Sequence, residues 1–326
     1  MKWMSRTILG VTGAVLGATM AFAEAREVRI ASHVSEYSPL HAQSKLFVAE
    51  IEKRLPGQFK FSLFPGGQLG KEKALMANVQ AGAIEMINVA SGVMKLDKKL
   101  GVFDLPWLFK DRAHVQRAMA AGLEDAVRAR IEEIGRVKVI GVYENGFRHV
   151  INAKRPVASP DDLEGLKIRI SGGKFRQGVF KNIGATPQSV PWGETFTALQ
   201  TGVVDGAEAA TYGFYEQKHY EVAKHLSLTS HVYTPSFLLM SQAFFDSLTP
   251  DQQAVFLQAG RDITKAAYEA SAALEKKYFE VMQSLIKINK VDQAAFQQAT
   301  ASSYDDYVNK AGTDFLKYVR DTADTM

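Results

Sequence analysis

Segments with the pattern of strands and segments with the pattern of helices alternate through the first two thirds of this chain. A strand is expected where apolar residues alternate or cluster over a few positions, and a helix where they recur every three to four positions. The first expected elements are strands at 28–31, 59–63 and 85–89, with helices at 39–54 and 71–81 between them. This β-α-β-α-β order requires a largely parallel sheet with helices on its faces, and so predicts an α/β fold.

The alternation continues to about residue 240, where the composition changes. Further short strands are expected at 137–143, 150–152, 167–170, 188–190, 203–205 and 231–240, around helices at about 112–134, 174–183 and 193–201. Thr249 and Gln252 flank Pro250 as in a capping box with proline at the first helical position. Because no proline follows, we expect one long helix from Pro250 to residue 286 and then two shorter ones.

The length of the chain indicates two lobes. About 300 residues is the size at which a single hydrophobic core begins to divide. We therefore expect residues 24–150 to form mainly one lobe and residues 151–240 mainly a second, with strands crossing between them. The helices of residues 241–326 would complete both lobes, and the longest of them would brace the two.

Residues 1–23 have the composition of an export signal. Lys2 and Arg6 supply positive charge, the thirteen residues from Ile8 to Met20 carry no charge, and alanine occupies positions 21 and 23. Small residues at these two positions suit a signal peptidase. The alternative, a membrane anchor, would need about 20 apolar residues. We therefore expect cleavage before Glu24, or else after Ala25, and a periplasmic location for the mature protein.

The composition excludes several classes of protein. Cysteine is absent, which excludes disulfides, thiolate metal sites, cysteine nucleophiles and a lipoprotein anchor. Loss of Lys2 and Arg6 would lower the number of basic residues from 39 to 37 against 35 acidic ones, so the net charge would fall from +4 to +2. Because a nucleic-acid-binding protein would carry a basic stripe, we expect no nucleic-acid partner.

The sequence lacks the common signatures of catalytic and cofactor sites. It contains no H-E-x-x-H motif, nucleophile elbow, P-loop or dinucleotide fingerprint. Glu216 and His219 form a lone E-x-x-H pair, which is more often solvated surface than a metal site. Gly66, Gly67 and Gly70 open a helix after a strand, which fits a phosphate cradle or a plain turn. We expect no catalysis, no metal and no cofactor.

Arg169 is the strongest candidate for a ligand-binding residue. It alternates with Ile168 and Ile170 on an expected strand, so its side chain points away from theirs. A guanidinium fixed there can offer a carboxylate two parallel N–H donors, and the backbone amides of 171–173 could meet the same anion. The alternative is an ion pair on a lobe surface. Arg148 is a second basic candidate, and the two together favour a small acid as the ligand.

Eight short motifs stand in an order that resembles one protein family. They are Phe-Pro-x-x-Gln-Leu-Gly at 64–70, Gln-Ala-Gly-Ala-Ile-Glu-Met at 80–86, Leu-Pro-Trp-Leu-Phe at 105–109, Asn-Gly-Phe-Arg at 145–148, Ser-Pro-Asp-Asp-Leu-Glu-Gly-Leu-Lys-Ile-Arg at 159–169, Gly-Ala-Thr-Pro at 184–187, Trp-Gly-Glu-Thr-Phe-Thr-Ala-Leu-Gln-Thr-Gly at 192–202 and Val-Asp-Gly-Ala-Glu at 204–208. Over about residues 28–245 the chain thus resembles the dicarboxylate-binding-protein family, the solute-binding proteins of tripartite ATP-independent periplasmic (TRAP) transporters.

The resemblance implies a two-lobed periplasmic-binding-protein fold of the α/β class, with mixed sheets, crossing strands and a long bracing C-terminal helix. It implies that Arg169 pairs with the carboxylate of the ligand and that Arg148 makes a second contact. It also implies that Glu208, just past the Asp-Gly turn, belongs to the polar network around the ligand. Further residues that it places at the pocket are Trp192, the loop 210–214 with Tyr212 and Phe214, and Ser91, His33 and Tyr37 from the other lobe.

The function that the resemblance implies is capture of a small organic carboxylate between the lobes. The protein would then deliver this ligand to integral-membrane permease subunits that are driven by an ion gradient. It would act as a monomer. Two alternatives remain open: the binding protein of an ATP-driven importer, which has a similar build, and a secreted hydrolase or isomerase that acts on a small acid.

One departure from the family pattern concerns the ligand. Members commonly carry asparagine after the position of Glu208, often followed by proline, whereas Ala209 and Ala210 stand here. The exchange removes a hydrogen-bonding group and opens volume. It therefore predicts an acid that is bulkier or less polar than a simple four-carbon dicarboxylate.

Overall fold

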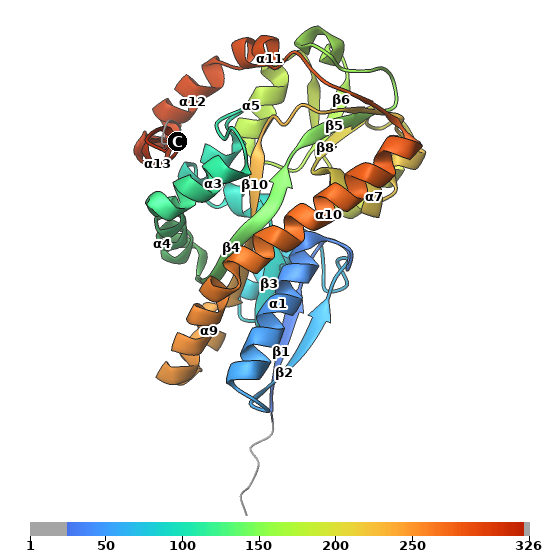
Figure 1. Cartoon of the computed structure of the whole chain (residues 1–326). Coiled ribbons are helices and arrows are strands. Elements are labelled where there is room, and N and C mark those ends of the chain that lie inside the picture. The colour runs from blue at the N-terminus through green and yellow to red at the C-terminus, as the bar shows by residue number, and fades with distance from the viewer. Residues whose placement is uncertain (1–24, 323–326) are drawn as a thin grey trace, which may run out of the picture.

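The computed structural model describes residues 25–322, so the expected export signal and its cleavage before Glu24 lie outside the described residues. The strands form two sheets, one in the lower and one in the upper half of Figure 1. We call the part built on the lower sheet lobe 1 and the part built on the upper sheet lobe 2. This two-lobed α/β architecture with mixed sheets confirms the expected fold class.

The sheet of lobe 1 has the strand order β2-β1-β3-β10-β4. Its strands are β1 (Arg26–Ala31), β2 (Phe59–Phe64), β3 (Met86–Val89), β4 (Val137–Phe147) and β10 (Tyr233–Ser241). β1 pairs in parallel with β2 and β3, because helices α1 (Pro39–Arg54) and α2 (Glu72–Gln80) serve as crossovers. β10 runs antiparallel between β3 and β4.

The sheet of lobe 2 has the order β11-β9-β5-β8-β6-β7. Its strands are β5 (His149–Asn152), β6 (Lys167–Ile170), β7 (Thr186–Ser189), β8 (Gly206–Ala209), β9 (His225–Ser227) and β11 (Lys287–Asn289). β5 begins directly after Arg148, which itself follows the last residue of β4. The chain therefore crosses from lobe 1 to lobe 2 at Arg148, and it crosses back between β9 and β10.

Two strands of lobe 2 lie away from their expected positions. β8 covers 206–209 instead of 203–205, and β7 covers 186–189 instead of 188–190. The sequence prediction placed this strand at Val203 and Val204 because both are β-branched, yet Val203 is exposed. A Cβ at Gly206 would lie 2.6 Å from the carbonyl oxygen of Ile151, so the centre of this sheet admits only small residues there. As a result Glu208 lies within a strand and not past a turn.

Some helical segments before residue 240 differ from the sequence prediction, whereas α1 has the expected bounds. The segment expected as one helix at 112–134 consists of α3 (Arg112–Ala118), a π-helical turn (Met119–Leu123) and α4 (Glu124–Gly135), with Gly122 at φ 114°. The other helices are α5 (Lys174–Asn182), α6 (Thr195–Gln200) and α7 (Thr211–Glu216). Short 3-10 turns lie at Ser91–Lys95, Lys99–Asp104, Pro160–Leu163, Trp192–Glu194 and His219–Glu221. The expected loop 210–214 is thus mostly the start of α7.

The long C-terminal helix is interrupted once. After α8 (Gln242–Asp246), α9 (Pro250–Asp262) and α10 (Thr264–Leu285) follow each other with only Ile263 between them. The hydroxyl of Tyr143 donates a hydrogen bond of 2.9 Å to the carbonyl of Gly260, the acceptor that Thr264 N–H would use in a continuous α-helix. Three shorter helices follow instead of the two expected, namely α11 (Gln293–Ala299), α12 (Ser302–Ala311) and α13 (Asp314–Arg320).

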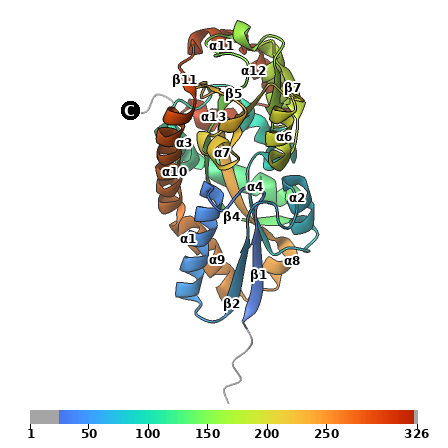
Figure 2. The ribbon, with the colours of Figure 1, turned by 90° about the vertical axis from the view of Figure 1, so that its right-hand side faces the viewer.

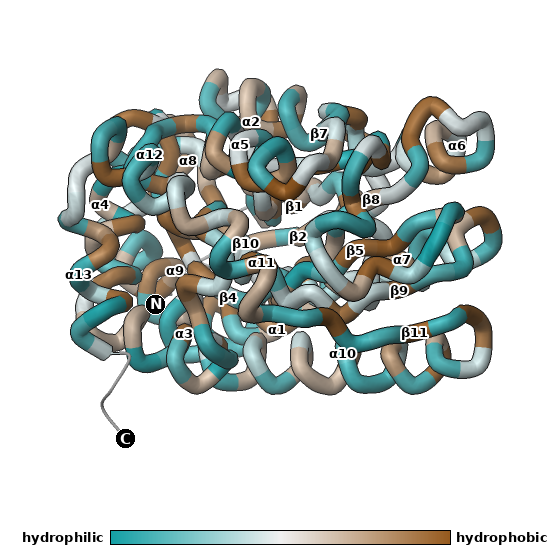
Figure 3. Tube along the Cα trace, turned by 90° about the horizontal axis from the view of Figure 1, so that it is seen from above, coloured by the Kyte–Doolittle hydropathy of each residue, from teal (hydrophilic) through white to brown (hydrophobic). Residues whose placement is uncertain are grey.

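Helix α10 contacts both lobes. It packs against α1 and β4 and, further along, against α7, and Figures 1 and 2 show it running alongside both sheets. Seen from above in Figure 3, polar and apolar residues alternate along it, as expected of a helix with one buried side. Within residues 25–322, no helix combines the length and apolar character that a bilayer crossing requires.

Candidate functional site

A cavity of about 530 Å³ lies between the two lobes. From lobe 1 it is lined by residues that follow β1, β2 and β3, and from lobe 2 by residues at the ends of β6, β7 and β8 and in α7. The predicted site residues among its lining are His33, Ser91, Arg148, Arg169, Trp192 and Tyr212. Ala209 and Ala210 also line it, so both departures from the family pattern face the cavity.

Arg169 is held in the cavity wall with part of its guanidinium unpaired. Its Nε donates a hydrogen bond of 2.9 Å to the carbonyl of Val190, and its Cζ lies 5.0 Å from the ring centroid of Trp192. The side chain is only 3% exposed, yet Nη1 is buried without a partner and Nη2 makes no hydrogen bond with residues 25–322. Burial lowers the pKa of Arg169 to about 10, so the group remains charged at neutral pH.

This arrangement leaves the two terminal nitrogens of Arg169 available for an external acceptor. A buried cation without a counter-ion is costly, and proteins usually pair such groups. A planar carboxylate matches two parallel N–H donors of a guanidinium. The geometry can therefore bind a carboxylate that enters the cavity. The alternative considered for Arg169, an ion pair on a lobe surface, does not occur within the described chain.

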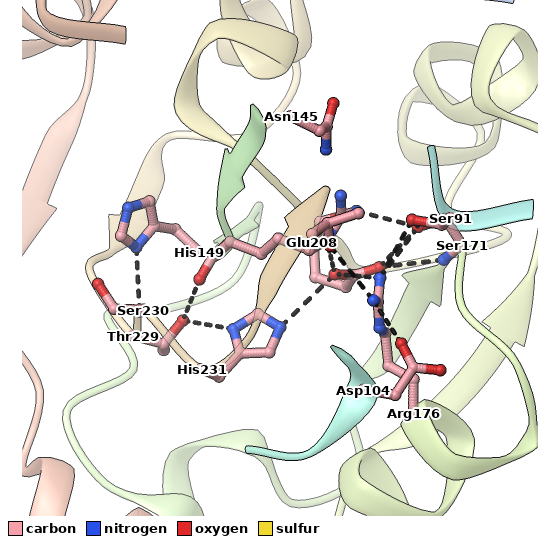
Figure 4. A network of polar contacts seen from close by, with 12 residues as sticks. Ser91, Asp104, Asn145, His149, Ser171, Arg176, Glu208, Thr229, Ser230 and His231 are labelled. Atoms are coloured by element: carbon pink, nitrogen blue, oxygen red, sulfur yellow. Dashed lines mark hydrogen bonds and ion pairs between the residues drawn. The ribbon is translucent and has the colours of Figure 1, made fainter. Parts of the chain in front are cut away.

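Glu208 is the centre of a buried polar network that Figure 4 shows. Its Oε1 accepts hydrogen bonds from the backbone N (3.0 Å) and Oγ (3.2 Å) of Ser171, and its Oε2 accepts one from Arg148 Nε. Arg176 Nη1 and His231 Nε2 each lie 3.5 Å from Oε2. Burial raises the pKa of Glu208, but Arg148 and Arg176 lower it by more, so the net pKa is well below the usual range. Glu208 is thus a fixed anion.

Arg148 differs from Arg169 because its charge is already balanced. Besides the bond to Glu208 Oε2, its Nη2 donates to the backbone carbonyl of Glu208 at 2.7 Å and to Ser171 Oγ at 3.0 Å. These bonds tie the crossing point of the two lobes to β8 and to the end of β6. Arg148 therefore sets the polarity of the cavity wall, whereas Arg169 provides the uncompensated charge.

The expected anion cradle of residues 171–173 is occupied by carboxylates of the protein. Ser171 N donates to Glu208, and Gly173 N donates to Asp104 Oδ2 at 3.4 Å. Asp104 also pairs at 2.5 Å with Arg176, whose side chain is fully buried. Sequence analysis missed this pair, although Arg176 shares the buried face of α5 with Val179 and Phe180.

The glycines after β2 form a turn and not a phosphate cradle. Gly66 N and Gly67 N donate to the carbonyls of Val34 and Ser32, and Gly70 N donates to the carbonyl of Gly67. These amides hold the turn against the segment that follows β1. The turn leads into α2, whose first residue, Glu72, lines the cavity and was also missed.

Three predicted residues do not line the cavity: Glu208, which is fully buried behind its wall, Tyr37 and Phe214. Tyr37 is 61% exposed, and its carbonyl accepts a hydrogen bond of 3.4 Å from Tyr278 in α10. Phe214 is fully buried in the core of lobe 2, where its ring lies 6.1 Å from that of His219. Because 211–216 form a helix, Tyr212 and Gly213 face the cavity whereas Phe214 points into the core.

Several hydrogen bonds join the lobes around the cavity. Ser35 Oγ of lobe 1 donates at 2.6 Å to Glu216 Oε2 of lobe 2, and Trp192 Nε1, also in lobe 2, donates at 3.3 Å to the other oxygen of Glu216. Ser91 Oγ and Ser171 Oγ share a hydrogen bond of 3.2 Å, and Lys71 pairs with Glu194 at the exposed rim. Burial raises the pKa of Glu216 to about 7. The lobes are therefore in a closed arrangement.

Glu216 and His219 do not form a metal site. Glu216 bonds Ser35 and Trp192, while both ring nitrogens of His219 are buried without a partner. Burial lowers the pKa of His219 to about 3, which keeps the ring neutral. Across residues 25–322, no three His, Cys, Asp or Glu side chains gather in a way that could hold a metal ion.

Comparisons with known proteins agree with this geometry. Residues 30–311 match the family described as "Bacterial extracellular solute-binding protein, family 7". The chain is 31% identical over 301 residues to the 2,3-diketo-L-gulonate-binding periplasmic protein YiaO of Escherichia coli (strain K12). The aligned region covers 90% of this chain and 92% of that protein.

Two solved structures show the same fold. One is a TRAP periplasmic solute-binding protein from Polaromonas sp. JS666 bound to D-erythronate, with 28% identity, a TM-score of 0.87 and coverage of 90% of this chain and 98% of that one. The other is the sugar acid binding protein DctPAm from Advenella mimigardefordensis strain DPN7T in complex with galactonate, with 27% identity, a TM-score of 0.87 and coverage of 92% and 98%.

The family match spans most of the described residues, and the likeness of fold extends over both lobes. It favours the resemblance drawn from the eight motifs over the ATP-driven importer and the secreted enzyme. The chain belongs to family 7 of the bacterial extracellular solute-binding proteins, the solute-binding proteins of TRAP transporters.

Proposed function

We propose that this protein captures a small organic carboxylate in the cavity between its lobes, with Arg169 as the residue that pairs with the carboxylate. The observation that carries the proposal is the state of Arg169, which is buried and fixed through Nε and Trp192, while Nη1 and Nη2 have no acceptor within the described residues. A ligand carboxylate would remove this unfavourable burial of an unpaired donor.

The proposed ligand is larger than a four-carbon dicarboxylate. Ala209 and Ala210 line the cavity with methyl groups only, and the cavity volume of about 530 Å³ lies in the range of small-molecule sites. Structural neighbours bind acids of several sizes, including D-erythronate and galactonate. Ser91, His33 and Tyr212 would contact the remainder of the ligand, while Arg148 and Glu208 fix the wall around Arg169.

The proposed setting is the periplasm, after removal of residues 1–23. There the protein would diffuse as a monomer and deliver its ligand to the integral-membrane permease of a TRAP system, without catalysing a reaction and without a nucleic-acid partner. Release requires the lobes to separate, which would break the bonds from Ser35 to Glu216 and from Ser171 to Ser91. Membership of the family supports this division of roles.

A thermal-shift screen of the mature protein tests the proposal. The panel contains four-carbon diacids, keto acids, aldonates, uronates and aromatic acids, with neutral sugars and amino acids as controls. A ligand at about 100 times its dissociation constant adds about 2.7 kcal/mol to the free energy of unfolding, which raises the melting temperature measurably. We expect shifts confined to one class of acid. Shifts with neutral sugars alone would contradict the proposal.

A further inference from the structure

The cavity contains an acidic group whose position is as carefully fixed as that of Arg169. Glu72, the first residue of α2, lines the cavity from lobe 1 with its side chain 16% exposed. Its Oε1 accepts hydrogen bonds from the backbone N of Ala90 (3.1 Å) and of Gly92 (3.0 Å). The segment after β3 therefore orients the carboxylate through main-chain donors and does not neutralise it with a basic side chain.

Gly92 makes room for this carboxylate. A Cβ at Gly92 would lie 2.8 Å from Cδ and 2.9 Å from Cγ of Glu72, which is closer than non-bonded carbon atoms approach. Any other residue there would push the Glu72 side chain away from its two backbone donors. The position of Glu72 thus depends on the absence of a side chain at 92.

One oxygen of Glu72 is available to a ligand. Oε2 accepts no hydrogen bond from any residue in 25–322, and this oxygen is not buried. It is therefore accessible. The nearby acidic groups differ, because Glu208, behind the cavity wall, is saturated by Arg148 and Ser171, and Glu194, in the lining, pairs with Lys71. Glu72 alone among these three combines a fixed position with a free acceptor.

The charge of Glu72 is retained in this position. Burial raises its pKa, but the His33 ring and the N–H groups of Gly92 and Ala90 lower it by more, so that the net pKa is below the usual range. His33 Nε2 lies 3.8 Å from Oε1, yet burial lowers the pKa of His33 itself, which leaves the ring neutral. The two backbone donors and the charge of Lys95 then stabilise the carboxylate, although Lys73 and Lys95 themselves are exposed at the rim.

The described lining of the cavity therefore combines a buried cation with unpaired donors, Arg169, and a fixed carboxylate with a free acceptor oxygen, Glu72. We propose that Glu72 reads the end of the ligand remote from its carboxylate, accepting a hydrogen bond from a hydroxyl group there and repelling a second carboxylate. The inference rests on the proposed function, in which Arg169 holds the first carboxylate. It assigns the ligand to the hydroxylated monocarboxylates and excludes diacids of the same length.

Matched pairs of acids test this inference by isothermal titration calorimetry. Each pair has the same carbon chain and hydroxyl configuration, and differs only in a terminal hydroxymethyl or a terminal carboxylate: D-galactonate with galactarate, and D-erythronate with meso-tartrate. We expect the wild type to bind at least one monocarboxylate about ten-fold or more tightly than its diacid partner, because a hydrogen bond to a charged acceptor contributes about this much and like charges repel.

Three variants separate the role of Glu72 from general charge effects. Glu72→Gln should reduce the preference for the monocarboxylate to about three-fold or less, because the amide accepts a weaker hydrogen bond and carries no charge. Gly92→Ala keeps the charge but displaces the carboxylate, and should reduce the preference as well. Glu52→Gln removes the same charge from an exposed position on α1 outside the cavity, and should leave the preference unchanged.

The outcomes distinguish this inference from the proposed function. If acids bind in a manner that depends on Arg169, but Glu72→Gln leaves the ratio of the two affinities unchanged, the role of Glu72 is refuted and the carboxylate site stands. Tighter binding of the diacids by the wild type, or binding of none of the four acids, would also overturn the inference. Binding that does not depend on Arg169 would overturn the proposed function itself.

Discussion

Replacement of Arg169 by methionine should strongly weaken ligand binding without unfolding the protein. Methionine keeps an unbranched apolar side chain beside Trp192 but removes both terminal nitrogens. Two charge-assisted hydrogen bonds at about 1.5–3 kcal/mol each amount to about 3–6 kcal/mol. The dissociation constant for the carboxylate should therefore rise by a factor of about 10² to 10⁴.

The stability of the unliganded variant provides a second, independent readout. A pKa lowered to about 10 by burial means that the charged form of Arg169 costs the folded state about 3 kcal/mol at any pH below that value. Loss of the hydrogen bond to Val190 and of the stacking on Trp192 offsets most of this gain, at about 1–3 kcal/mol together. The melting temperature should hence stay within about 3 °C of the wild type or rise.

Calorimetric titration with the acid identified in the screen measures the first effect, and a thermal melt without ligand measures the second. Lys167→Met is the matched control, because Lys167 lies on the same strand two residues away but does not line the cavity. Unchanged affinity in Arg169→Met would refute the carboxylate site. A fall of the unliganded melting temperature by 10 °C or so would show instead that Arg169 has a structural role.

Three further predictions concern the network and the rim. Glu208→Gln should lower the melting temperature by about 5 °C or more, because Arg148 and Arg176 would lose the buried anion between them, a loss that costs about 3–5 kcal/mol. The pKa of Glu216 is raised to about 7, so its protonated carboxyl stabilises the folded state fully below pH 4.5, and this contribution is lost as the pH rises through 7. In melting curves from pH 5 to 8, the melting temperature of Glu216→Gln should accordingly rise relative to that of the wild type as the pH increases. Lys71→Ala should change the ligand affinity by less than about five-fold, since an exposed ion pair contributes at most about 1 kcal/mol.

Each of these predictions has a contrary outcome. A melting temperature of Glu208→Gln equal to that of the wild type would mean that water replaces the carboxylate at the centre of the network. Parallel pH profiles for Glu216→Gln and wild type would show that Glu216 does not titrate in this range. A large loss of affinity in Lys71→Ala would place Lys71 in contact with the ligand and not at the rim.

The parts of the fold that the sequence predicted well are those in which apolar spacing decides the structure. β1, α1, β2 and α5 lie within about two residues of their expected positions, because each buries a regular face against one core. β8 was misplaced since its residues Gly-Ala-Glu-Ala have no strand pattern, and only its neighbours β5 and β6 make it a strand. At the break at Ile263, the carbonyl of Gly260 accepts a hydrogen bond from Tyr143, which is 120 positions from Ile263, and local spacing cannot reveal such a contact.

The site was predictable only where a motif marked it. Arg148, Arg169 and Glu208 are each the last residue of a motif, so the sequence pointed to all three. Asp104 and Arg176 form their pair across 72 positions, and the amides that orient Glu72 lie 18 and 20 positions from it. Long-range pairing of this kind is set by the packing of the sheets, and a single sequence carries no direct signal for it.

A crystal structure of the mature protein with the acid that gives the largest thermal shift tests the central claim most directly. We predict that the carboxylate of the ligand lies between the lobes within about 3 Å of Nη1 and Nη2 of Arg169, with Nε still bound to Val190. A carboxylate bound elsewhere, with both terminal nitrogens of Arg169 still unpaired, would contradict the account.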